Sequence, residues 1–213
     1  MALPPLFALK KQVEELLAAS GLETVTLRAD VFMDTAFAAM GSGIPLRGAV
    51  HAALAGSASA TMLRPFPFAR KFFDNVQTSI EQKGQALVPG DGQRRHAFIC
   101  ADDVARYLTA AALGGPAGAF DLAGPEALSY LDVVSVWSRV LGRPVKASHT
   151  PVFVFRAMGL ALGPFNPAAS NLMKLNVLSA TTESQPEPAT AAAFGLPLTT
   201  AEQFLRAKAA LPA

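Results

Sequence analysis

The sequence predicts an α/β protein built around a mainly parallel sheet. Three observations support this fold class: helical and strand-like segments alternate over the first 150 residues, the strand-like segments are short and β-branched, and glycine or proline separates most of them. Hydrophobic residues make up 51% of the 213 residues and charged residues only 16%. The chain is therefore apolar enough to form a buried core.

The first predicted unit is a helix followed by a strand. Residues 10–20 place Val13, Leu16 and Leu17 on one helical face, which we expect to be buried. A glycine ends the helix, and residues 23–28 (ETVTLR) then form a strand, because three β-branched residues stand in a row.

The next segment is less regular. Residues 31–71 are rich in Ala, Gly, Ser, Phe and Pro, and we interpret them as short apolar helices joined by loops, with a helix near 49–56 and a turn near 64–68. Residues 72–83 are predicted to be helical and to end at Gly84.

A turn at residues 89–92 (PGDG) separates two short predicted strands, and a helix over 101–113 follows. Asp102 or Asp103 is expected to be the N-cap of this helix. Its inner face is expected to carry Val104, Leu108, Ala111 and Ala112.

The remaining elements follow the same logic. Ser129 and Asp132 have the spacing of a capping box, so a helix should start there and end at Leu141. The other predicted elements are a strand over 119–124, a strand over 145–150, helices beyond residue 150 with breaks at Pro167 and residues 181–188, and a last helix over 201–211 capped by Thr200.

Charge and composition exclude several function classes. A net charge of +2 with scattered basic residues gives no argument for nucleic-acid binding. The single cysteine cannot form an internal disulfide, which fits a cytoplasmic protein without a signal peptide. Residues 48–63 are too short and too rich in Gly and Ser to span a bilayer. For this segment and for residues 151–165, weak peripheral membrane contact is the less favoured alternative to a buried or lid segment.

Four segments, in this order, resemble one known family. They are Lys10 with VEELLAASGLETVTLRADVFMD (13–34), HAFICADDVARYLTAAAL (96–113), GAFDLAGPEALSYLDVVSVWSRVLGRPV (118–145) and FGLPLTTAEQFLRA (194–207). Together they resemble the later part of the extended and atypical short-chain dehydrogenases/reductases, a group that includes NmrA-like and nucleotide-sugar-epimerase-like NAD(P)-binding proteins.

The resemblance implies a partial Rossmann-like fold, doubly wound and mainly parallel. Residues 1–125 would be the C-terminal part of the NAD(P)-binding domain, with an apolar insertion at about 34–72. Residues 126–213 would be a mostly helical substrate or lid lobe. Phe and Met residues in the insertion are expected to belong to the core or to a lid.

The glycine-rich turn that grips the dinucleotide phosphates in this family has no counterpart here. Such a turn must join a strand to a helix, because backbone N–H groups and the helix N-terminus hold the pyrophosphate. Glycines at 41–43, 90–92 and 114–118 do not stand between a strand and a helix. We therefore expect a truncated relative whose cofactor binding is impaired.

The resemblance also suggests cofactor-binding residues. Lys10 corresponds to the lysine of the family's Tyr-x-x-x-Lys pair, which gives it a catalytic and cofactor-binding role, but the tyrosine position is Leu6. An equally good interpretation is a solvent-facing lysine. Residues Arg28, Ala29, Asp30, Val31, Phe32 and Met33 leave the strand on the nicotinamide side of the cleft. Alternatively, Arg28 pairs with a carboxylate such as Asp103.

Arg95 and His96 precede a strand that should face the substrate cleft. All three histidines, His51, His96 and His149, are nevertheless more readily explained as structural or exposed. Cys100 is expected to behave as a small buried hydrophobic residue. No cysteines, histidines or carboxylates have metal-ligand spacing, so no metal site is predicted.

The function implied is that of an NAD- or NADP-dependent oxidoreductase acting on a small apolar or nucleotide-linked substrate. Two alternatives remain open: a non-catalytic NmrA-like dinucleotide sensor or scaffold, and an incomplete gene product without independent activity. An exposed sheet edge would then allow a protein partner or self-association.

Overall fold

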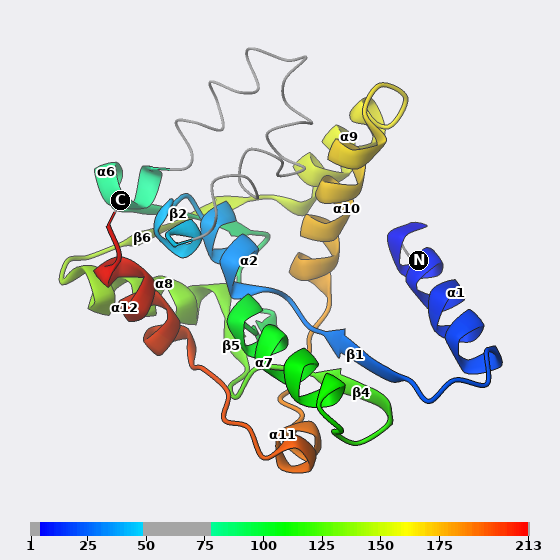
Figure 1. Cartoon of the computed structure of the whole chain (residues 1–213). Helices are drawn as coiled ribbons and strands as arrows, with labels where there is room; N and C mark the ends of the chain where they lie inside the picture. The colour runs from blue at the N-terminus through cyan, green and yellow to red at the C-terminus, as the bar shows by residue number, and fades with distance from the viewer. Residues whose placement is uncertain (1–4, 49–77, 213) are drawn as a thin grey trace.

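A computed structural model of the chain describes residues 5–48 and 78–212 (Figure 1). Its helices are α1 (Pro5–Ala19), α2 (Met33–Ala39), the 3-10 helix η1 (Ile44–Leu46), α6 (Ser79–Lys83), α7 (Ala101–Ala112), α8 (Tyr130–Leu141), α9 (Val152–Leu162), α10 (Pro167–Thr181), α11 (Pro188–Phe194) and α12 (Ala201–Ala210). Its strands are β1 (Val25–Ala29), β2 (Gln85–Pro89), β3 (Arg95–His96), β4 (Gly118–Leu122), β5 (Leu128–Ser129) and β6 (Lys146–Thr150).

The strands pair mainly in parallel. β1 runs parallel to β4, with Leu27 opposite Phe120, and β2 runs parallel to β6, with Leu87 opposite Ser148. The short β3 and β5 are antiparallel, and a further parallel bridge joins Phe32 to Ile99. The predicted α/β class with a mainly parallel sheet is confirmed.

The main core lies between the β2–β6 pair and helices α2, α8 and α12. Phe37 of α2 is fully buried, and its ring contacts those of Phe98 and Phe204 at centroid distances of 5.1 and 6.1 Å. Trp137 of α8 is also fully buried in the same cluster. Phe37 and Met40 lie in the segment predicted to be an insertion, so this part of it belongs to the core.

The helix starts predicted from capping patterns at α8 and α12 are confirmed. At α8, the Ser129 hydroxyl accepts the N–H of Asp132 while the Asp132 carboxylate accepts the N–H of Ser129. Thr200 and Gln203 form the equivalent reciprocal pair at α12. These local contacts satisfy N–H groups that would otherwise lack partners, which explains why the sequence identified both helices correctly.

The start and the inner face of α7 differ from expectation. The N-cap is Cys100, and Asp103 lies inside the first turn, where it is buried. The buried face carries Tyr107, whereas Leu108 is half exposed. The buried face was predicted wrongly because it contains Asp103, and an aspartate is normally expected to face solvent.

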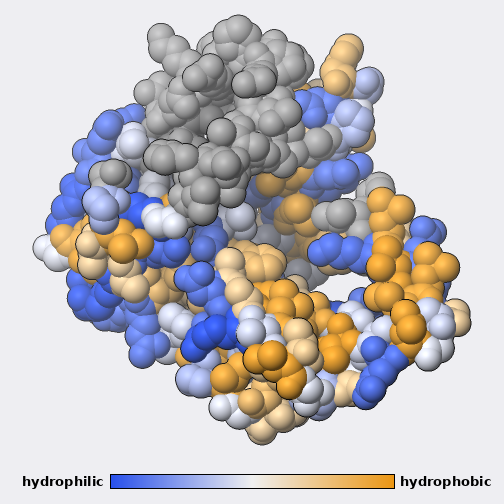
Figure 2. Space-filling view, in the orientation of Figure 1, coloured by the Kyte–Doolittle hydropathy of each residue, from blue (hydrophilic) through white to orange (hydrophobic). Residues whose placement is uncertain are grey.

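The largest difference concerns α1. Val13 and Leu16, expected in the core, are 54% and 72% exposed, and Leu17 is also exposed. In Figure 1 α1 stands apart from the other helices, and Figure 2 shows its hydrophobic surface beside a hollow in the molecule. The helix forms as predicted, but its apolar face contacts no other described element closely enough to be buried.

Other predictions fall partly or wholly outside the described residues. Of the predicted helix over 72–83, the structure describes Ser79–Lys83, which ends at Gly84 in a left-handed conformation. The features predicted at 49–56 and 64–68 lie outside the described residues. The division into 1–125 and 126–213 remains a prediction. No helix in the described part is long and apolar enough to cross a bilayer.

Candidate functional site

The best-placed segment for ligand binding follows β1, where the carboxyl ends of β1 and β4 lie together. Asp30 N–H donates to Leu122 O of β4 at 3.0 Å, and Met33 N–H donates to Ile99 O at 2.8 Å. The segment Asp30–Met33 is therefore held between β4 and the residues around Ile99 that lead into α7. Crevices beyond the carboxyl ends of parallel strands are the usual ligand sites in α/β sheets.

Gly124 allows two backbone segments to approach each other closely at this edge of the sheet. A Cβ built on Gly124 would lie 1.8 Å from the carbonyl oxygen of Phe98, so no other residue fits there without moving the backbone. Gly124 N–H donates to Ala97 O at 2.9 Å. The strand ends on both sides of the segment are thus fixed by main-chain contacts.

Arg28 at the end of β1 forms a bidentate pair with Glu14 of α1. Its Nε donates to Glu14 Oε1 at 3.2 Å and its Nη2 to Oε2 at 2.8 Å, while Asp121 lies 3.5 Å from Nη1. Hydrogen bonding from Arg28 lowers the pKa of Glu14, and hydrogen bonding from Glu14 raises the pKa of Arg28. The suggested partner Asp103 was wrong, although pairing with a carboxylate was correct.

Lys10 lies one helical turn before Glu14 and on the same side of α1, because residues four apart face the same direction. Its side chain is exposed. Glu14 holds this side of the helix against β1, and the chain descends α1 and returns along β1 (Figure 1). Lys10 therefore lies on the Glu14 side of α1, one turn nearer the N-terminus of the helix.

The two predicted substrate-cleft residues point in opposite directions, as neighbouring residues of a strand do. Arg95 lines a surface groove, whereas His96 is 2% exposed. His96 Nε2 donates to Ser179 O at 2.7 Å, and the hydroxyls of Tyr130 and Ser179 are 2.6 Å apart. Burial raises the pKa of Tyr130. This cluster fixes α10 against β3 and α8.

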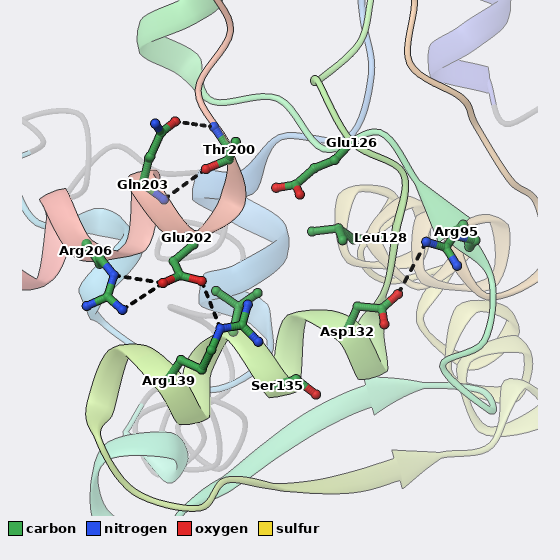
Figure 3. A pocket seen from close by; sticks show the side chains of 11 residues that line it. Arg95, Glu126, Leu128, Asp132, Ser135, Arg139, Thr200, Glu202, Gln203 and Arg206 are labelled. Atoms are coloured by element: carbon green, nitrogen blue, oxygen red, sulfur yellow. Dashed lines mark hydrogen bonds and ion pairs between the residues drawn. The ribbon is translucent and has the colours of Figure 1, made fainter.

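The groove lined by Arg95 lies between α8 and α12 and has a volume of about 520 Å³ (Figure 3). Three arginines and three carboxylates line it: Arg95, Arg139, Arg206, Glu126, Asp132 and Glu202. The carboxylate of Glu202 binds two of the arginines, with Arg139 Nε and Arg206 Nη2 donating at 2.9 and 2.7 Å. The formal charges of the six residues cancel, so the groove offers no excess positive charge to a phosphate.

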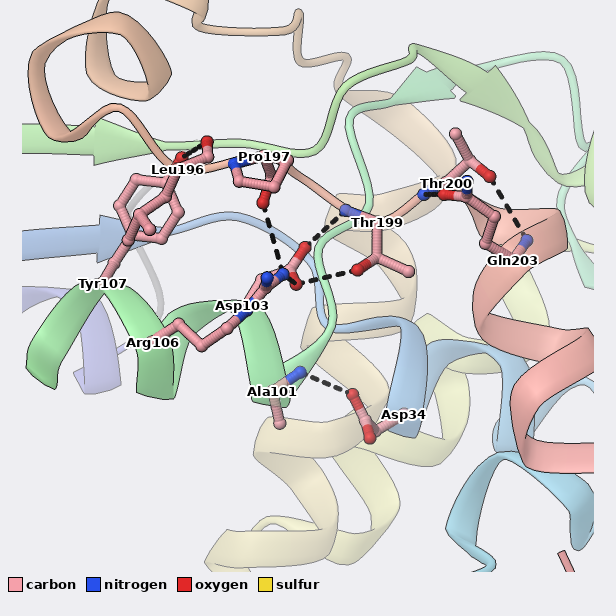
Figure 4. Close-up of polar contacts among 10 residues, drawn as sticks. All are labelled: Asp34, Ala101, Asp103, Arg106, Tyr107, Leu196, Pro197, Thr199, Thr200 and Gln203. Carbon is pink, nitrogen blue, oxygen red and sulfur yellow. Dashed lines mark hydrogen bonds and ion pairs between the residues drawn. The ribbon is translucent and has the colours of Figure 1, made fainter. Parts of the chain in front are cut away.

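Asp103 is a buried structural carboxylate that the sequence did not reveal as such (Figure 4). It accepts hydrogen bonds from Thr199 N–H at 2.7 Å and Thr199 Oγ1 at 2.8 Å, and it pairs with Arg106. The N–H of Ala101, at the start of α7, donates a hydrogen bond to Asp34 Oδ2 at 2.8 Å. Asp103 thereby ties α7 to the segment before α12.

The helix starts nearest the strand ends carry acidic residues in their first turns. Asp34 lies in the first turn of α2 and binds the first N–H of α7, whose first turn also contains Asp102 and Asp103. A pyrophosphate needs free N–H groups and a positive helix terminus. These two helix starts therefore do not fit the phosphates of a dinucleotide.

The remaining candidates have structural surroundings. Cys100 is buried, as predicted, and burial raises its pKa to about 11. His149 Nδ1 lies 3.0 Å from Gly90 O, and His51 lies outside the described residues. Among the described residues, no three cysteines, histidines or carboxylates are grouped closely enough to hold a metal ion.

No family model matches the chain. The chain is similar to an uncharacterized oxidoreductase, YesF, from Bacillus subtilis (strain 168), with 34% identity over 106 residues. The match covers 48% of this chain and 36% of that protein. The chain thus spans little more than a third of the relative's length.

Three solved structures share the fold. A nucleoside-diphosphate-sugar epimerase from Staphylococcus aureus matches with a TM-score of 0.56 and 16% identity, over 92% of this chain and 56% of that one. An isoflavone reductase matches with a TM-score of 0.63 and 14% identity, over 97% and 60%. The NADPH-dependent quinone oxidoreductase QOR2 of Escherichia coli, complexed with NADPH, matches with a TM-score of 0.51 and 16% identity, over 88% and 66%.

This chain aligns over nearly its whole length with little more than half of the epimerase and of the isoflavone reductase. The resemblance seen in the sequence is therefore confirmed at the level of the fold. The chain has the Rossmann-like α/β fold that these two reductases and the epimerase share.

Proposed function

We propose that the chain is an NAD(P)-dependent oxidoreductase-like protein that supplies the substrate side and the nicotinamide side of the cofactor crevice. The observation that carries this is the carboxyl end of the β1–β4 pair, where Asp30–Met33 lies beyond the strands. The fold shared with an NADPH-bound quinone oxidoreductase supports the cofactor class.

In this proposal the chain's own residues orient the cofactor. Lys10 would bind the nicotinamide ribose hydroxyls, and the backbone of Asp30–Met33 would line the side of the ring. The bound nicotinamide would supply hydride chemistry. No tyrosine stands four residues before Lys10, since that position is Leu6. The chain's residues thus position the cofactor without a recognised proton donor.

We propose that the chain binds the pyrophosphate of the cofactor weakly or not at all. No strand–glycine–helix motif occurs in the sequence, and the first turns of α2 and α7 carry acidic residues in the structure. The contacts to the adenosine half would then contribute little to binding. We also propose a cytoplasmic location, in keeping with the single buried cysteine.

A non-catalytic role as a dinucleotide sensor or scaffold is the second candidate. The observation that favours it is Leu6, because a relative without the tyrosine can bind a nicotinamide cofactor and yet lack the proton-transfer group. The two candidates share the binding site. They differ only in whether bound NADPH is consumed with a small quinone or another apolar acceptor.

The test is a calorimetric titration of the chain with NADPH and with NADH. We expect saturable binding that Lys10→Ala weakens by about tenfold, as loss of one charge-assisted hydrogen bond would do. Lys11→Ala is the matched control, because its ammonium group pairs instead with Glu15 at 3.8 Å. Absence of binding at several millimolar cofactor, or equal effects of both substitutions, would contradict the proposed site.

A further inference from the structure

The groove between α8 and α12 is electrically neutral as a whole, but one of its ends is positive. At this end the Glu202 carboxylate binds both Arg139 and Arg206, which gives a formal charge of +1 (Figure 3). Hydrogen bonds from Arg206 and Arg139 lower the pKa of Glu202, so the three groups stay ionised at neutral pH. Both Nη groups of Arg139 and Nη1 of Arg206 donate to no described residue. They can therefore donate to an anionic group in the groove.

The rest of the groove is negative, because Glu126 and Asp132 line it together with only one arginine, Arg95. Glu126 Oε1 accepts the N–H of Ala201 at 2.9 Å, and Asp132 Oδ2 accepts from the N–H and hydroxyl of Ser129. The second oxygen of each carboxylate receives no hydrogen bond from the described part of the chain. These two oxygens are suitable acceptors for an ammonium group.

Helix α8 sets the distance between the two ends. Asp132, Ser135, Val136 and Arg139 all line the groove, and their spacing places them along one side of the helix. Asp132 and Arg139 are two turns apart, which corresponds to about 10 Å along the helix axis. An extended peptide advances roughly 3.3–3.6 Å per residue, so about three residues cover this distance. A single α-amino acid is too short to reach both ends.

From this arrangement we infer that the groove binds a short peptide with free termini, about three residues long. The ammonium group of the peptide lies against Glu126 and Asp132, and its carboxylate accepts hydrogen bonds from Arg139 and Arg206. The groove volume of about 520 Å³ falls within the usual range of ligand pockets, about 300–1,000 Å³. Leu128 provides an apolar part of the wall for the peptide's side chains.

The charge distribution excludes simpler ligands. A ligand with only negative charge would meet the two carboxylates, and one with only positive charge would meet the arginines, so neither matches the whole groove. The groove shares no residue with the Asp30–Met33 segment. The inference is therefore independent of the proposed cofactor site.

Calorimetric titration of the full chain with trialanine and its two blocked forms tests the inference. N-acetyl-trialanine lacks the ammonium group, and trialanine amide lacks the carboxylate. We expect saturable binding of trialanine and a loss of about tenfold or more in affinity for each blocked peptide. No saturable binding at tens of millimolar trialanine would overturn the inference, and so would an affinity that either block leaves unchanged.

Two substitutions assign the ends of the peptide. Arg139→Gln should weaken binding of trialanine about tenfold and leave binding of trialanine amide unchanged, because the amide has no carboxylate. Glu126→Gln keeps an oxygen that can accept from Ala201, and it should weaken binding of trialanine but not of N-acetyl-trialanine. Arg156→Gln is the matched control, because Arg156 is exposed on α9 and lies outside the groove. Equal effects of Arg139→Gln and Arg156→Gln would contradict the proposed site.

Discussion

The region around Phe37 and the region around α1 use apolar residues in opposite ways. Phe37, Trp137 and Leu205 come from three helices and are fully buried together. Leu9, Val13 and Leu16 are equally apolar and lie on a well-formed helix, yet more than half of each side chain is exposed. The comparison shows that an amphipathic pattern predicts a helix reliably but does not say what covers its apolar face.

Electrostatic contacts differ between the regions in the same way. Away from α1, the fully buried Asp103 joins α7 to the chain before α12. α1 is joined to β1 by the ion pair of Arg28 with Glu14, and the Arg28 side chain is 50% exposed. Exposed ion pairs contribute little to stability, whereas removing a buried hydrogen-bonded carboxylate is costly. The following predictions test this contrast.

The largest expected effect is that of Phe37→Ala. Removing this ring from the core should lower the free energy of unfolding by roughly 3–5 kcal/mol, because the Phe98 and Phe204 rings would face a cavity. Leu16→Ala should change it by less than about 0.5 kcal/mol. Urea unfolding measures both, and a similar loss for the two variants would show that α1 is packed.

Asp103→Ala should lower the free energy of unfolding by roughly 3 kcal/mol. The substitution leaves the N–H and hydroxyl of Thr199 and the guanidinium of Arg106 without their acceptor. Asp102→Ala is the control, since Asp102 is an exposed neighbour on the same helical turn. Chemical denaturation of both variants measures the difference, and equal stabilities would contradict a structural role for Asp103.

Cys100 should be nearly unreactive while the chain is folded. Burial raises its pKa from 9.0 to about 11, which lowers the thiolate fraction at pH 8 by about 100-fold before restricted access is considered. Alkylation by iodoacetamide, followed by mass spectrometry with and without urea, measures the ratio. Comparable labelling in both conditions would mean that the strand before α7 opens readily.

The capping box of α8 should give a smaller, pH-dependent effect. Burial raises the pKa of Asp132, but hydrogen bonds from the N–H and hydroxyl of Ser129 outweigh it, so the pKa is lowered. The carboxylate therefore stabilises the fold above its unfolded pKa, and this stabilisation is lost as the pH falls through the lowered folded pKa. Asp132→Asn should cost about 1 kcal/mol at pH 7.

Denaturation of the wild type and Asp132→Asn from pH 7 down to pH 2 checks this sign. The difference between them should shrink below about pH 4. A difference that grows on acidification would contradict the capping role of the ionised carboxylate.

The sequence predicted local features well because their causes are local. The capping boxes at Ser129 and Thr200 and the turn at residues 89–92 follow from residues a few positions apart, and the structure contains all three. The order of four segments also gave the fold, which the solved structures confirm.

Long-range features could not be obtained in this way. Asp103 was expected to cap a helix, but its partner Thr199 lies 96 positions away, and nothing near Asp103 indicates that contact. Arg95 and His96 were both assigned to the substrate cleft, yet strand alternation sends one to the surface groove and the other to Ser179. The exposure of α1 depends on what lies beside it in space, which helical periodicity does not encode.

The central claim is that the chain provides a crevice for the nicotinamide half of the cofactor and little for the adenosine half. The most direct test compares the affinities of reduced nicotinamide mononucleotide, NADPH and 2′,5′-ADP by calorimetry. We predict that the mononucleotide binds within about fivefold of NADPH, a difference of about 1 kcal/mol, and that 2′,5′-ADP shows no saturable binding. Micromolar NADPH binding together with tight binding of 2′,5′-ADP would contradict this claim.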